Sequence, residues 1–486
     1  MQQLAPLDAQ FLTMESHRIG GHVCGLAVLD PSTAPGGTLT LEDVRAVLEA
    51  RLGALLPFRR RLAPVPFDLD RPYWIEDPDF DLDFHLREAA VPPPGTREQL
   101  ADVCARIAAR ALDRGHPLWE VYLVHGLEEG RVALLVKIHH AAADGLSGMD
   151  VLDVLVDRER DAPTVREDLP ERPAPERAPS ELGMLARGLA ALPGQPLRAM
   201  RSLPATLVSL GDLPGVSTMP GMGLVTGAAE RLRALTDGGE VLDTVAVRAP
   251  PTRFNHKVSS QRALALTTID LARVKAVKDA TGVTVNDVVM ALCSGGVRRW
   301  LDERGELPDE SLVAMVPLSV RGEDEHGVFG NRVSAMFVPL HTDLDEPGGR
   351  LRSITQTMQL VKERFRALPA SVMQDVSDLL PTAILNRAVR AYVALNGVGR
   401  MRPLNLVVSN VPGPREPRWC AGARMEHYFP ISVVTDGCGL NITCISYCGG
   451  IDFGILGCRK ALDDPWGLAR AIEDELGELE AAVAAA

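Results

Sequence analysis

The segment KIHHAAADG, residues 137–145, places two histidines side by side, followed by three alanines, an aspartate and a glycine. An imidazole titrates near neutral pH, so His139 or His140 is suited to act as a general base. The small alanine side chains predict open space beside the imidazole, as substrate access from two sides requires. Asp144 and Gly145 form a turn, where we expect Asp144 to fix the backbone through an ion pair with an arginine.

The elements around this segment decide which histidine faces a substrate. The run VALLVKI before the histidines predicts a strand, and LSGMDVLDVLVDRE after the turn predicts a helix. Neighbouring side chains on a strand point to opposite faces of the sheet. We therefore expect one catalytic imidazole and one supporting or packing partner.

Spacing alone leaves other interpretations open. The histidine pair is also consistent with a structural strand end, or with a metal site built from two histidines and one carboxylate. Asp-Gly is also a common turn dipeptide without further function. The sequence contains no GxSxG, P-loop or HExxH motif, and GMGLVTG (221–227) does not fit GxGxxG.

Composition limits the classes of function. The chain has 486 residues, 46% of them apolar, which predicts two domains or two fused halves with ample cores. A net charge of −13 and an aromatic content of 4% argue against a nucleic-acid partner. The same charge argues against purely electrostatic docking to an anionic membrane and leaves hydrophobic docking open.

The cysteines and the hydropathy pattern indicate a compartment. The eight cysteines form no CxxC pair, so we expect small buried apolar residues and neither a disulfide framework nor a metal site. The sequence shows no charged-then-apolar leader and no apolar run of membrane-spanning length. We therefore expect a cytoplasmic protein.

The chain divides into three parts. Residues 1–160 alternate between predicted strands and helices, and residues 257–486 resume that pattern. Between them, residues 161–256 begin with a charged, proline-rich stretch, with ten prolines in 161–220. The apolar segment 181–210 within it predicts a crossover packed across both halves, a lid or an amphipathic surface for lipid.

Elements of both halves follow from hydrophobic periodicity. Predicted strands cover 22–30, 118–127, 131–140, 311–320, 331–340, 404–411 and 439–456. Predicted helices cover 41–52, 97–112, 267–282, 284–305 and 463–486. The fold class is therefore α/β, with mixed strands and helices in both halves.

Several segments carry a family resemblance. HHAAADG matches HHxxxDG, the signature of the superfamily that includes chloramphenicol acetyltransferase and peptide-synthetase condensation domains. In family order, the chain resembles bacterial wax ester synthases/acyl-CoA:diacylglycerol acyltransferases in LAPLDAQFLTMES, HPLWEVYLVHGL, VNDVVMALCSGGVRRWL, VPLSVRGEDEHGVFGNRVSAMFVPL, VVSNVPGP and ISYCGGIDFG. The proline-rich stretch is the part that the resemblance covers least.

The resemblance implies a fold and an activity. It implies two chloramphenicol-acetyltransferase-like halves with mixed sheets and an active-site channel at their interface. It also implies transfer of a long acyl group from acyl-CoA to diacylglycerol, which gives triacylglycerol, or to a fatty alcohol, which gives a wax ester. No metal or cofactor is implied, since acyl-CoA is the substrate. Peripheral attachment to a membrane or lipid droplet is implied as well.

Residue roles come from the same resemblance. His140 matches the catalytic histidine, which takes the proton of the acceptor hydroxyl in a ternary complex, and His139 matches the first histidine of the motif. Asp144 matches the structural aspartate, and Gly145 permits its turn. We expect Arg321 in PLSVR to pair with Asp144, because related superfamily members tie this aspartate to an arginine of the other half.

Three further residues are candidates for site support. Asn286 belongs to the family's Asn-Asp motif, and Ser409 and Asn410 precede VPGP. Asn286 is equally interpreted as a helix N-cap ahead of DVVMALC. The DFG of residues 452–454 resembles half of the DFGWG element of related acyltransferases, which implies a structural role.

The sequence leaves two alternatives to this acyltransferase. The acceptor is another hydroxyl compound, such as a polyketide or a glycolipid, or the chain is a lipid-binding protein without catalysis. A complete HHxxxDG argues against the second. A metal enzyme remains possible only if chelation abolishes activity.

Overall fold

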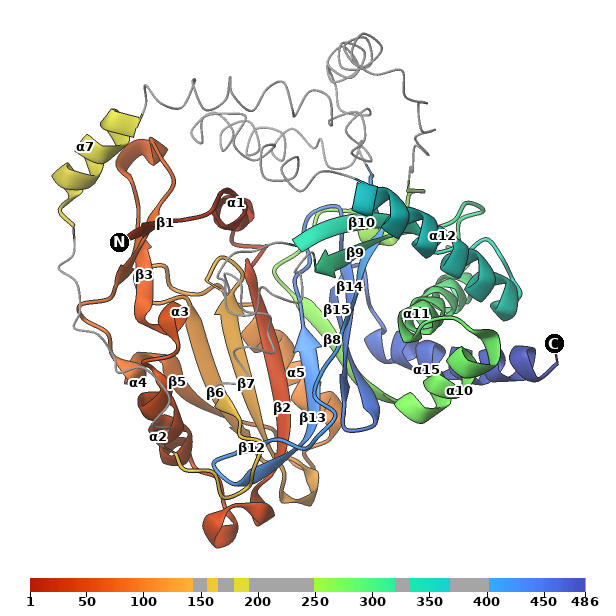
Figure 1. The fold of residues 1–486 in the computed structure, drawn as a ribbon, viewed down its shortest axis with the longest axis horizontal. Helices are drawn as coiled ribbons and strands as arrows, with labels where there is room; N and C mark the ends of the chain where they lie inside the picture. Colours follow the sequence, from red (N-terminus) through yellow and green to blue (C-terminus); the bar gives the residue numbers. More distant parts are fainter. Residues whose placement is uncertain (143–154, 165–178, 192–248, 320–332, 368–401, 486) are drawn as a thin grey trace.

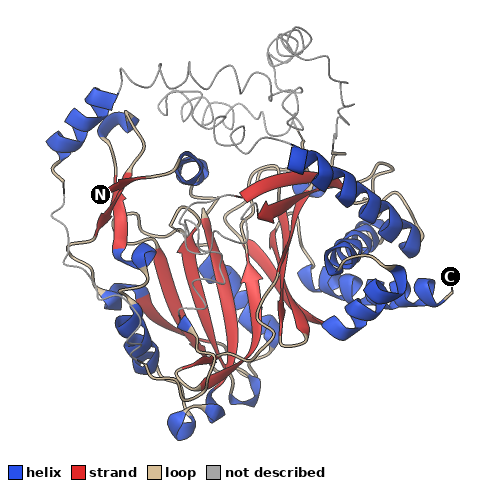
Figure 2. Cartoon of the chain, in the orientation of Figure 1, coloured by secondary structure: helices blue, strands red, loops and turns tan. Residues whose placement is uncertain are grey.

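The computed structural model describes residues 1–142, 155–164, 179–191, 249–319, 333–367 and 402–485. Two large sheets lie side by side, one built mainly from the first half of the chain and one from the second (Figure 1). Most helices lie on the outer sides of these sheets (Figure 2).

The first large sheet carries the paired histidines. Its strands are, in spatial order, β12 (Trp419–Cys420), β13 (Ala423–Ile431), β2 (His22–Asp30), β7 (Val132–His139), β6 (Trp119–His125) and β5 (Leu86–Ala90). All neighbours are antiparallel except β5 and β6, which are parallel. Every residue of β7 is buried, as its continuous apolar run predicts.

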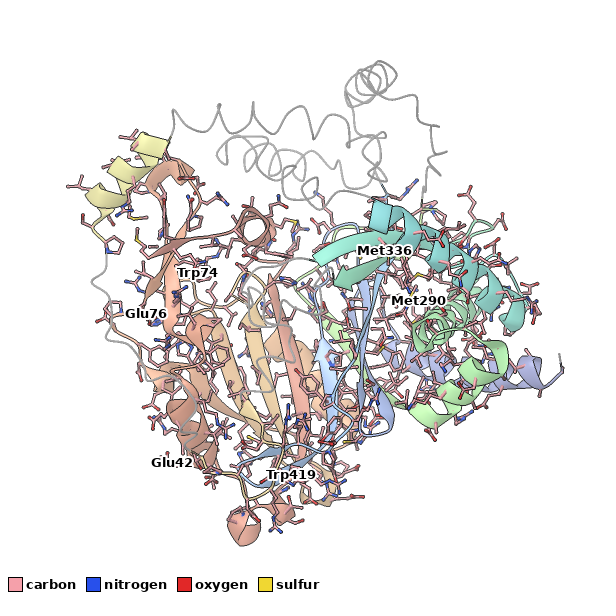
Figure 3. All side chains as sticks on the ribbon, viewed as in Figure 1. Glu42, Trp74, Glu76, Met290, Met336 and Trp419 are labelled. Atoms are coloured by element: carbon pink, nitrogen blue, oxygen red, sulfur yellow. The ribbon has the colours of Figure 1, made fainter. Side chains whose placement is uncertain are left out.

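The second large sheet is also mixed. Its strands are, in order, β10 (Val333–Pro339), β9 (Val313–Ser319), β11 (Leu406–Val411), β14 (Leu440–Tyr447), β15 (Gly450–Cys458) and β8 (Arg262–Asp270). Strand β11 is parallel to both of its neighbours. The helices on its outer side are α10 (Leu271–Thr281), α11 (Val285–Asp302), α12 (Pro347–Ala367) and α15 (Pro465–Ala484). Met290 of α11 and Met336 of β10 are buried in the core between this sheet and its helices (Figure 3).

A small third sheet lies at the edge of the first half. Its order is β1 (Gln2–Gln3), β4 (Tyr73–Glu76) and β3 (Arg60–Ala63). The helices of the first half and the crossover are α1 (Pro6–Met14), α2 (Leu41–Arg51), α3 (Leu56–Arg59), α4 (Leu82–His85), α5 (Arg97–Ala108) and α7 (Glu181–Ala191). Short 3-10 helices cover Pro31–Thr33, Pro35–Gly37, Pro66–Asp68, Glu128–Gly130 and Arg253–Asn255.

Local sequence signals set where the helices begin. Three of the described α-helices start at a threonine whose side chain accepts a backbone N–H. The residue three places later bonds back to the threonine N–H: Thr40 with Asp43 at α2, Thr96 with Gln99 at α5, and Thr284 with Asp287 at α11. Such a capping box satisfies two N–H groups that the first helical turn leaves without partners. Loss of one cap costs about 1 kcal/mol of stability.

Strand β13 ties the two halves together. It follows β11 in the sequence, yet it pairs with β2 in the first sheet, from Arg424 opposite Asp30 to Ile431 opposite Cys24. Where β13 passes β15, the backbone N–H of Tyr428 donates to the carboxylate of Asp452 at 2.8 Å. A Cβ on Gly454 would overlap the backbone oxygen of Pro430, so only glycine permits this approach.

An apolar core also joins the two sheets. Helix α5 packs against both β2 and β8. One cluster of buried side chains unites α5 with strands of both sheets, among them Leu100, Cys104, Leu26, Leu264, Leu266 and Phe429. Full burial of such side chains stabilises a fold by roughly 1.5–3 kcal/mol each. The halves are thus held by a shared core as well as by strand exchange.

The structure confirms most predicted elements and corrects two. The strand predicted over 439–456 is a hairpin of β14 and β15, which turns between Tyr447 and Gly450. Residues 267–270 were predicted as the start of a helix, but they complete β8, and α10 begins only at Leu271. Pairing with β15 explains this, since residues 267–270 continue the antiparallel ladder as far as Asp270 opposite Gly450. Strand β13 was not predicted at all. The helix predicted after Gly145 falls mostly outside the described residues.

Two further expectations concern cysteines and membrane spans. All eight cysteines are free, and all but Cys448 are buried, as expected, although Cys104 and Cys293 lie on helices. Within the described ranges, no single helix is long and apolar enough to cross a membrane. Helices α10 and α11 pass that test only as a pair, and the chain bends by 107° between them.

Candidate active site

The paired histidines lie where β7 ends beside the start of β2. His139 is the last residue of β7 and stands opposite His22, the first residue of β2. The backbone N–H of His140 donates to the carbonyl oxygen of Gly21 at 2.7 Å. The segment that enters β2 therefore fixes the backbone position of His140.

His139 is enclosed on all sides. Its side chain is 1% exposed, and its Nδ1 accepts the backbone N–H of Ala141 at 3.0 Å. Because Nδ1 accepts, the proton of the neutral ring is on Nε2. A Cβ on Gly21 would overlap this Nε2, so the ring occupies the space that the glycine leaves. Burial lowers the pKa of His139 to about 4, and the ring is neutral at pH 7.

A buried carboxylate faces His139. Glu15 Oε1 lies 3.7 Å from Nε2 of His139 and accepts the backbone N–H of Gly21 at 3.2 Å. Glu15 Oε2 is paired with the guanidinium of Arg114 at 2.6 Å, and Arg114 also donates to the carbonyl oxygen of Leu12. The Glu15 side chain is only 6% exposed, and Arg114 links it to the segment between α5 and β6.

His140 differs from its neighbour in burial and contacts. It lies in the turn after β7 and is partly exposed. Its ring stacks on Phe11 of α1, with centroids 3.9 Å apart and 18° between the planes. Burial lowers the pKa of His140 below its ordinary value of 6.5, so the neutral base predominates at pH 7. Stacking and the bond to Gly21 together orient a partly accessible basic ring.

Two of the candidate support residues meet in the second half. Asn410, near the end of β11, donates from Nδ2 to Oδ1 of Asn286 at 3.3 Å. The Oδ1 of Asn410 accepts from the thiol of Cys444 at 3.5 Å. Asn286 is not the N-cap of α11, because Thr284 occupies that position with Asp287 as its partner. The capping interpretation of Asn286 is therefore wrong, and its amide is directed to Asn410.

Ser409 lies beside this pair. It is partly buried on β11 and stands opposite Thr443 of β14. The next residue but one, Val411, packs against the core cluster that contains Ala141 and Ala142. The end of β11 and the residues after His140 thus contact the same apolar cluster at the junction of the halves.

The alanines of the motif do not have the environment expected of them. Ala141 is fully buried and Ala142 is 4% exposed, both inside the apolar cluster at the junction of the halves. Their small size permits close packing after β7, and the expectation of open space beside the imidazole is wrong for these two residues. Asp144, Gly145 and Arg321 lie outside the described residues.

Sequence reasoning missed three residues of this site: Phe11, Glu15 and Arg114. The first two lie in LAPLDAQFLTMES, which was noted for its resemblance and not for its chemistry. Contacts between α1 and a strand more than a hundred residues later carry no local periodic signal. The only local signal for a site here is that the carboxylate of Glu15 follows a helix that carries Phe11.

The fold and the site together define a class of protein. A starter condensation domain of a rhizomide synthetase aligns over 99% of this chain and 94% of its own, with a TM-score of 0.51 and 12% identity. At that identity the likeness shows the fold alone. The two-half acyltransferase fold that the sequence predicts is confirmed.

The chain belongs to the wax ester synthase/diacylglycerol acyltransferase family. The family's catalytic-domain model matches residues 4–289, and its C-terminal-domain model matches residues 329–480. A protein of Mycobacterium tuberculosis named as a diacylglycerol O-acyltransferase is 35% identical over 484 residues, or 99% of this chain and 90% of its own. The wax ester synthase/diacylglycerol acyltransferase from Marinobacter aquaeolei VT8 covers 99% of this chain and 100% of its own, with a TM-score of 0.68 and 27% identity. The protein is an acyltransferase.

Replacing Gly21 with alanine tests how the histidines are positioned. The new Cβ must displace His139 and shift the carbonyl that holds His140. We expect kcat for acyl transfer to fall by about 10²-fold, the scale of a misplacement of roughly 1 Å. Gly477→Ala on the exposed face of α15 is the matched control and should leave kcat unchanged. Equal activity of the two variants would contradict this account.

Acid sensitivity tests the burial of His139. The unfolded chain takes up this proton near pH 6.5, but the folded chain only near 4. The pKa of His139 is depressed in the folded chain. The contribution of neutral His139 to folding stability is therefore complete above pH 6.5 and is lost as pH falls toward 4. His139→Asn lacks this proton and should lose about 2 kcal/mol less stability between pH 7 and pH 5. Urea unfolding at both pH values measures this difference.

Gly477→Ala, on the exposed face of α15, removes no titratable group and is the control for acid sensitivity. It should lose as much stability as the unchanged protein between the two pH values. A His139→Asn variant with the same acid sensitivity as the unchanged protein would show that His139 is not buried in its neutral form.

Proposed function

We propose that the protein transfers a long acyl group from acyl-CoA to the free hydroxyl of diacylglycerol, with His140 as the general base. The observation that carries this proposal is the state of His140, a neutral, oriented and partly exposed imidazole at the junction of the two halves. The names of the relatives support the choice of diacylglycerol. A fatty alcohol is the second acceptor, supported by the name of the Marinobacter protein.

The proposed reaction proceeds by direct transfer in a ternary complex. His140 takes the proton of the acceptor hydroxyl while that oxygen attacks the thioester carbonyl. The tetrahedral intermediate then collapses, the C–S bond breaks, and CoA leaves as a thiolate that receives the proton from His140. Thiolate is a good leaving group, so removal of the hydroxyl proton is the step in which His140 matters most.

His139 has a positioning role in this proposal. Its ring packs against Gly21, which holds the N–H of His140, and it accepts a hydrogen bond from Ala141, the residue after His140. Glu15 fixes Gly21 through a hydrogen bond and faces the His139 ring. These contacts hold the backbone that presents His140 to the acceptor.

The oxyanion of the intermediate requires hydrogen-bond donors from the other half. Asn286 is the first candidate, because its Oδ1 accepts from Asn410 and its Nδ2 is thereby left as a donor. Each such donor contributes roughly 3 kcal/mol to stabilisation of the transition state. Ser409 and Asn410 complete the proposed support, and Asp144 with Gly145 and Arg321 is proposed to hold the turn after His140.

The acceptor lipid dissolves poorly in water, so we propose that the protein meets it at a membrane or lipid-droplet surface. Phe67 is 77% exposed, and Leu182 and Leu189 of α7 are 79% and 52% exposed. Gly188 of α7 lies against Val65 and Leu69, so these exposed side chains gather at one corner of the molecule. Exposed apolar side chains that gather in this way are typical of lipid contact sites.

Replacement of His140 tests the proposed base. We expect CoA release from palmitoyl-CoA to depend on added diacylglycerol or hexadecanol, and His140→Ala to lower kcat by 10²- to 10⁴-fold, the usual contribution of a general base. His125→Ala, on the surface, should retain full activity. The assay contains EDTA, so loss of activity on chelation would instead favour a metal site.

The other outcomes distinguish the alternatives. Transfer at an undiminished rate by His140→Ala would remove His140 as the base. An absence of transfer to both acceptors would contradict the proposed substrates and favour another hydroxyl acceptor or a lipid-binding role without catalysis.

The pH profile provides a separate test. Only the neutral imidazole can accept a proton, so kcat/KM should fall as pH falls through the pKa of His140. Because burial lowers that pKa, the acidic limb should have its midpoint below pH 6.5. A midpoint above 6.5, measured with both acceptors, would contradict the environment described for this ring.

A further inference from the structure

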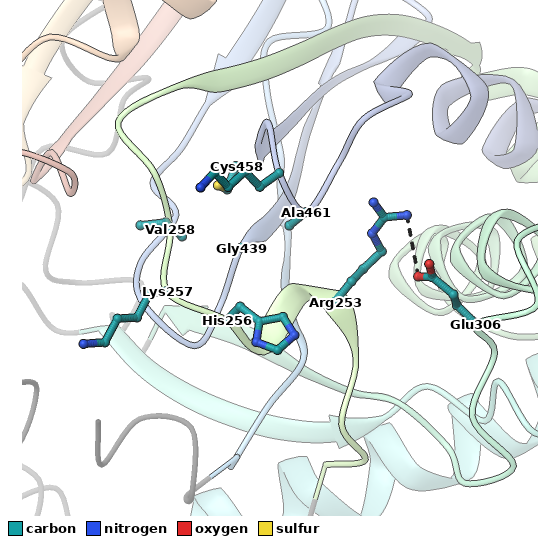
Figure 4. Close-up of a pocket in the computed structure, with 9 residues that line it drawn as sticks. Arg253, His256, Lys257, Val258, Glu306, Gly439, Cys458 and Ala461 are labelled. Atoms are coloured by element: carbon teal, nitrogen blue, oxygen red, sulfur yellow. Dashed lines mark ion pairs between the residues drawn. The ribbon is translucent and has the colours of Figure 1, made fainter. Parts of the chain in front are cut away.

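A second polar site, lined by residues of the second half, lies close to the segment that leads into β2. It is a cavity of about 320 Å³ between the segment that leads into β8 and the turn that follows β15. Figure 4 shows Val258 and Ala461 on its wall, with Arg253 and Glu306 at one end. Its volume falls at the lower end of the range for small-molecule sites.

The charge of this cavity is opposite to that of the protein. Three cationic side chains, Arg253, Lys257 and Lys460, line it together with one carboxylate, Glu306. The whole chain carries a net charge of −13, so a local excess of positive charge is unexpected. Such a concave cationic surface concentrates anions.

The cations of the cavity differ in their partners. Arg253 is already paired with Glu306 at 3.5 Å and with Asp463 at 3.1 Å, which fixes its guanidinium. Lys257 and Lys460 are exposed, and neither forms an ion pair with any residue in the described ranges. Two exposed ammonium groups around one cavity are suited to bind phosphate oxygens.

The cavity is connected to the candidate active site through one short segment. The Val258 carbonyl accepts from Nη1 of Arg18 at 3.4 Å, and Arg18 also pairs with the buried Asp436 at 3.3 Å. Arg18 precedes Gly21 by three residues, a span of at most about 10 Å. Gly21 in turn holds the backbone of His140. The cavity thus lies at the junction of the halves, near the same segment that positions the proposed base.

We propose that this cavity binds the phosphate groups at the nucleotide end of the acyl-CoA donor. This inference rests on the proposed function, because CoA joins a 3′-phosphate and a diphosphate to the reacting thioester through the long pantetheine arm. Lys257 and Lys460 bind the phosphate oxygens, and Val258 and Ala461 provide an apolar wall beside them. The thioester end is thereby free to reach toward His140.

A phospholipid head group presents the same phosphate chemistry, but a nucleotide fits better. The site is a cavity and not a flat face, and the strongly exposed apolar side chains of Phe67, Leu182 and Leu189 belong to the first half and the crossover. A lipid surface needs apolar contact around the head group, whereas the exposed residues at this cavity are polar: His256, Lys257, Glu306 and Lys460.

The first experiment compares donors that differ only in their phosphates. Removal of both lysines, Lys257→Ala with Lys460→Ala, should raise KM for palmitoyl-CoA by about tenfold, equivalent to roughly 1.4 kcal/mol. The same variant should show an unchanged kcat and an unchanged KM for palmitoyl-pantetheine, which lacks the nucleotide. Lys275→Ala, an exposed lysine on α10, is the matched control and should alter neither constant.

The second experiment does not require activity, so it separates this proposal from the proposed function. Adenosine 3′,5′-bisphosphate should bind the unchanged protein in calorimetry, and the double variant should bind it about tenfold more weakly. Lysine-dependent binding without any acyl transfer would support the phosphate site and contradict the proposed function.

Two outcomes would overturn the proposal. One is an equal rise of KM for palmitoyl-CoA and palmitoyl-pantetheine, which would show that the lysines do not act through the phosphates. The other is lysine-dependent binding to phosphatidate vesicles without binding of adenosine 3′,5′-bisphosphate, which would assign the cavity to a lipid head group.

Discussion

Close contact between the Gly20–Gly21 backbone and two imidazoles is the constraint on which the candidate active site depends. A Cβ on Gly20 would overlap His22, and a Cβ on Gly21 would overlap His139. The same Gly21 accepts from His140 through its carbonyl and donates to Glu15 through its N–H. One residue without a side chain therefore connects α1, β2 and β7. Any movement of Gly21 must displace both His139 and His140. The site therefore requires a rigid frame.

The exchange of β13 supplies part of that frame. A strand from the second half hydrogen-bonds to β2, the strand that begins at His22, so the sheet that carries the histidines is completed by the other half. Asp452 joins the exchanged strand to the second sheet, since its carboxylate accepts from Tyr428 N–H and from the hydroxyl of Thr268. A site at the junction can then combine groups from both halves without depending on a weak interface.

Sequence patterns predicted the continuous apolar run of β7 and elements with periodic apolar positions, including β2, α11 and α15. They did not predict β13, whose residues His427 and Pro430 interrupt the apolar pattern and whose partner strand lies about 400 positions earlier. For the site, the motif identified His139 and His140, but Glu15 and Arg114 depend on tertiary contacts that no local pattern encodes. The N-cap of α11 shows a related limit, because Thr284 and Asn286 are both good capping residues and only the structure distinguishes them.

The burial of the two rings supports a division of labour between them. If His139 took the acceptor proton, a cation would form at a position that is 1% exposed, where burial has already lowered the pKa to about 4. Such a weak base gives little driving force for removing a hydroxyl proton. Its Nδ1 is also occupied by the Ala141 N–H, and its Nε2 faces Glu15 and Gly21. His140 keeps partial exposure and stacks on Phe11, so a positive charge there costs less than at the enclosed His139. We therefore assign the transferred proton to His140 in the proposed reaction. His139 stays neutral and holds the backbone beside His140 in place.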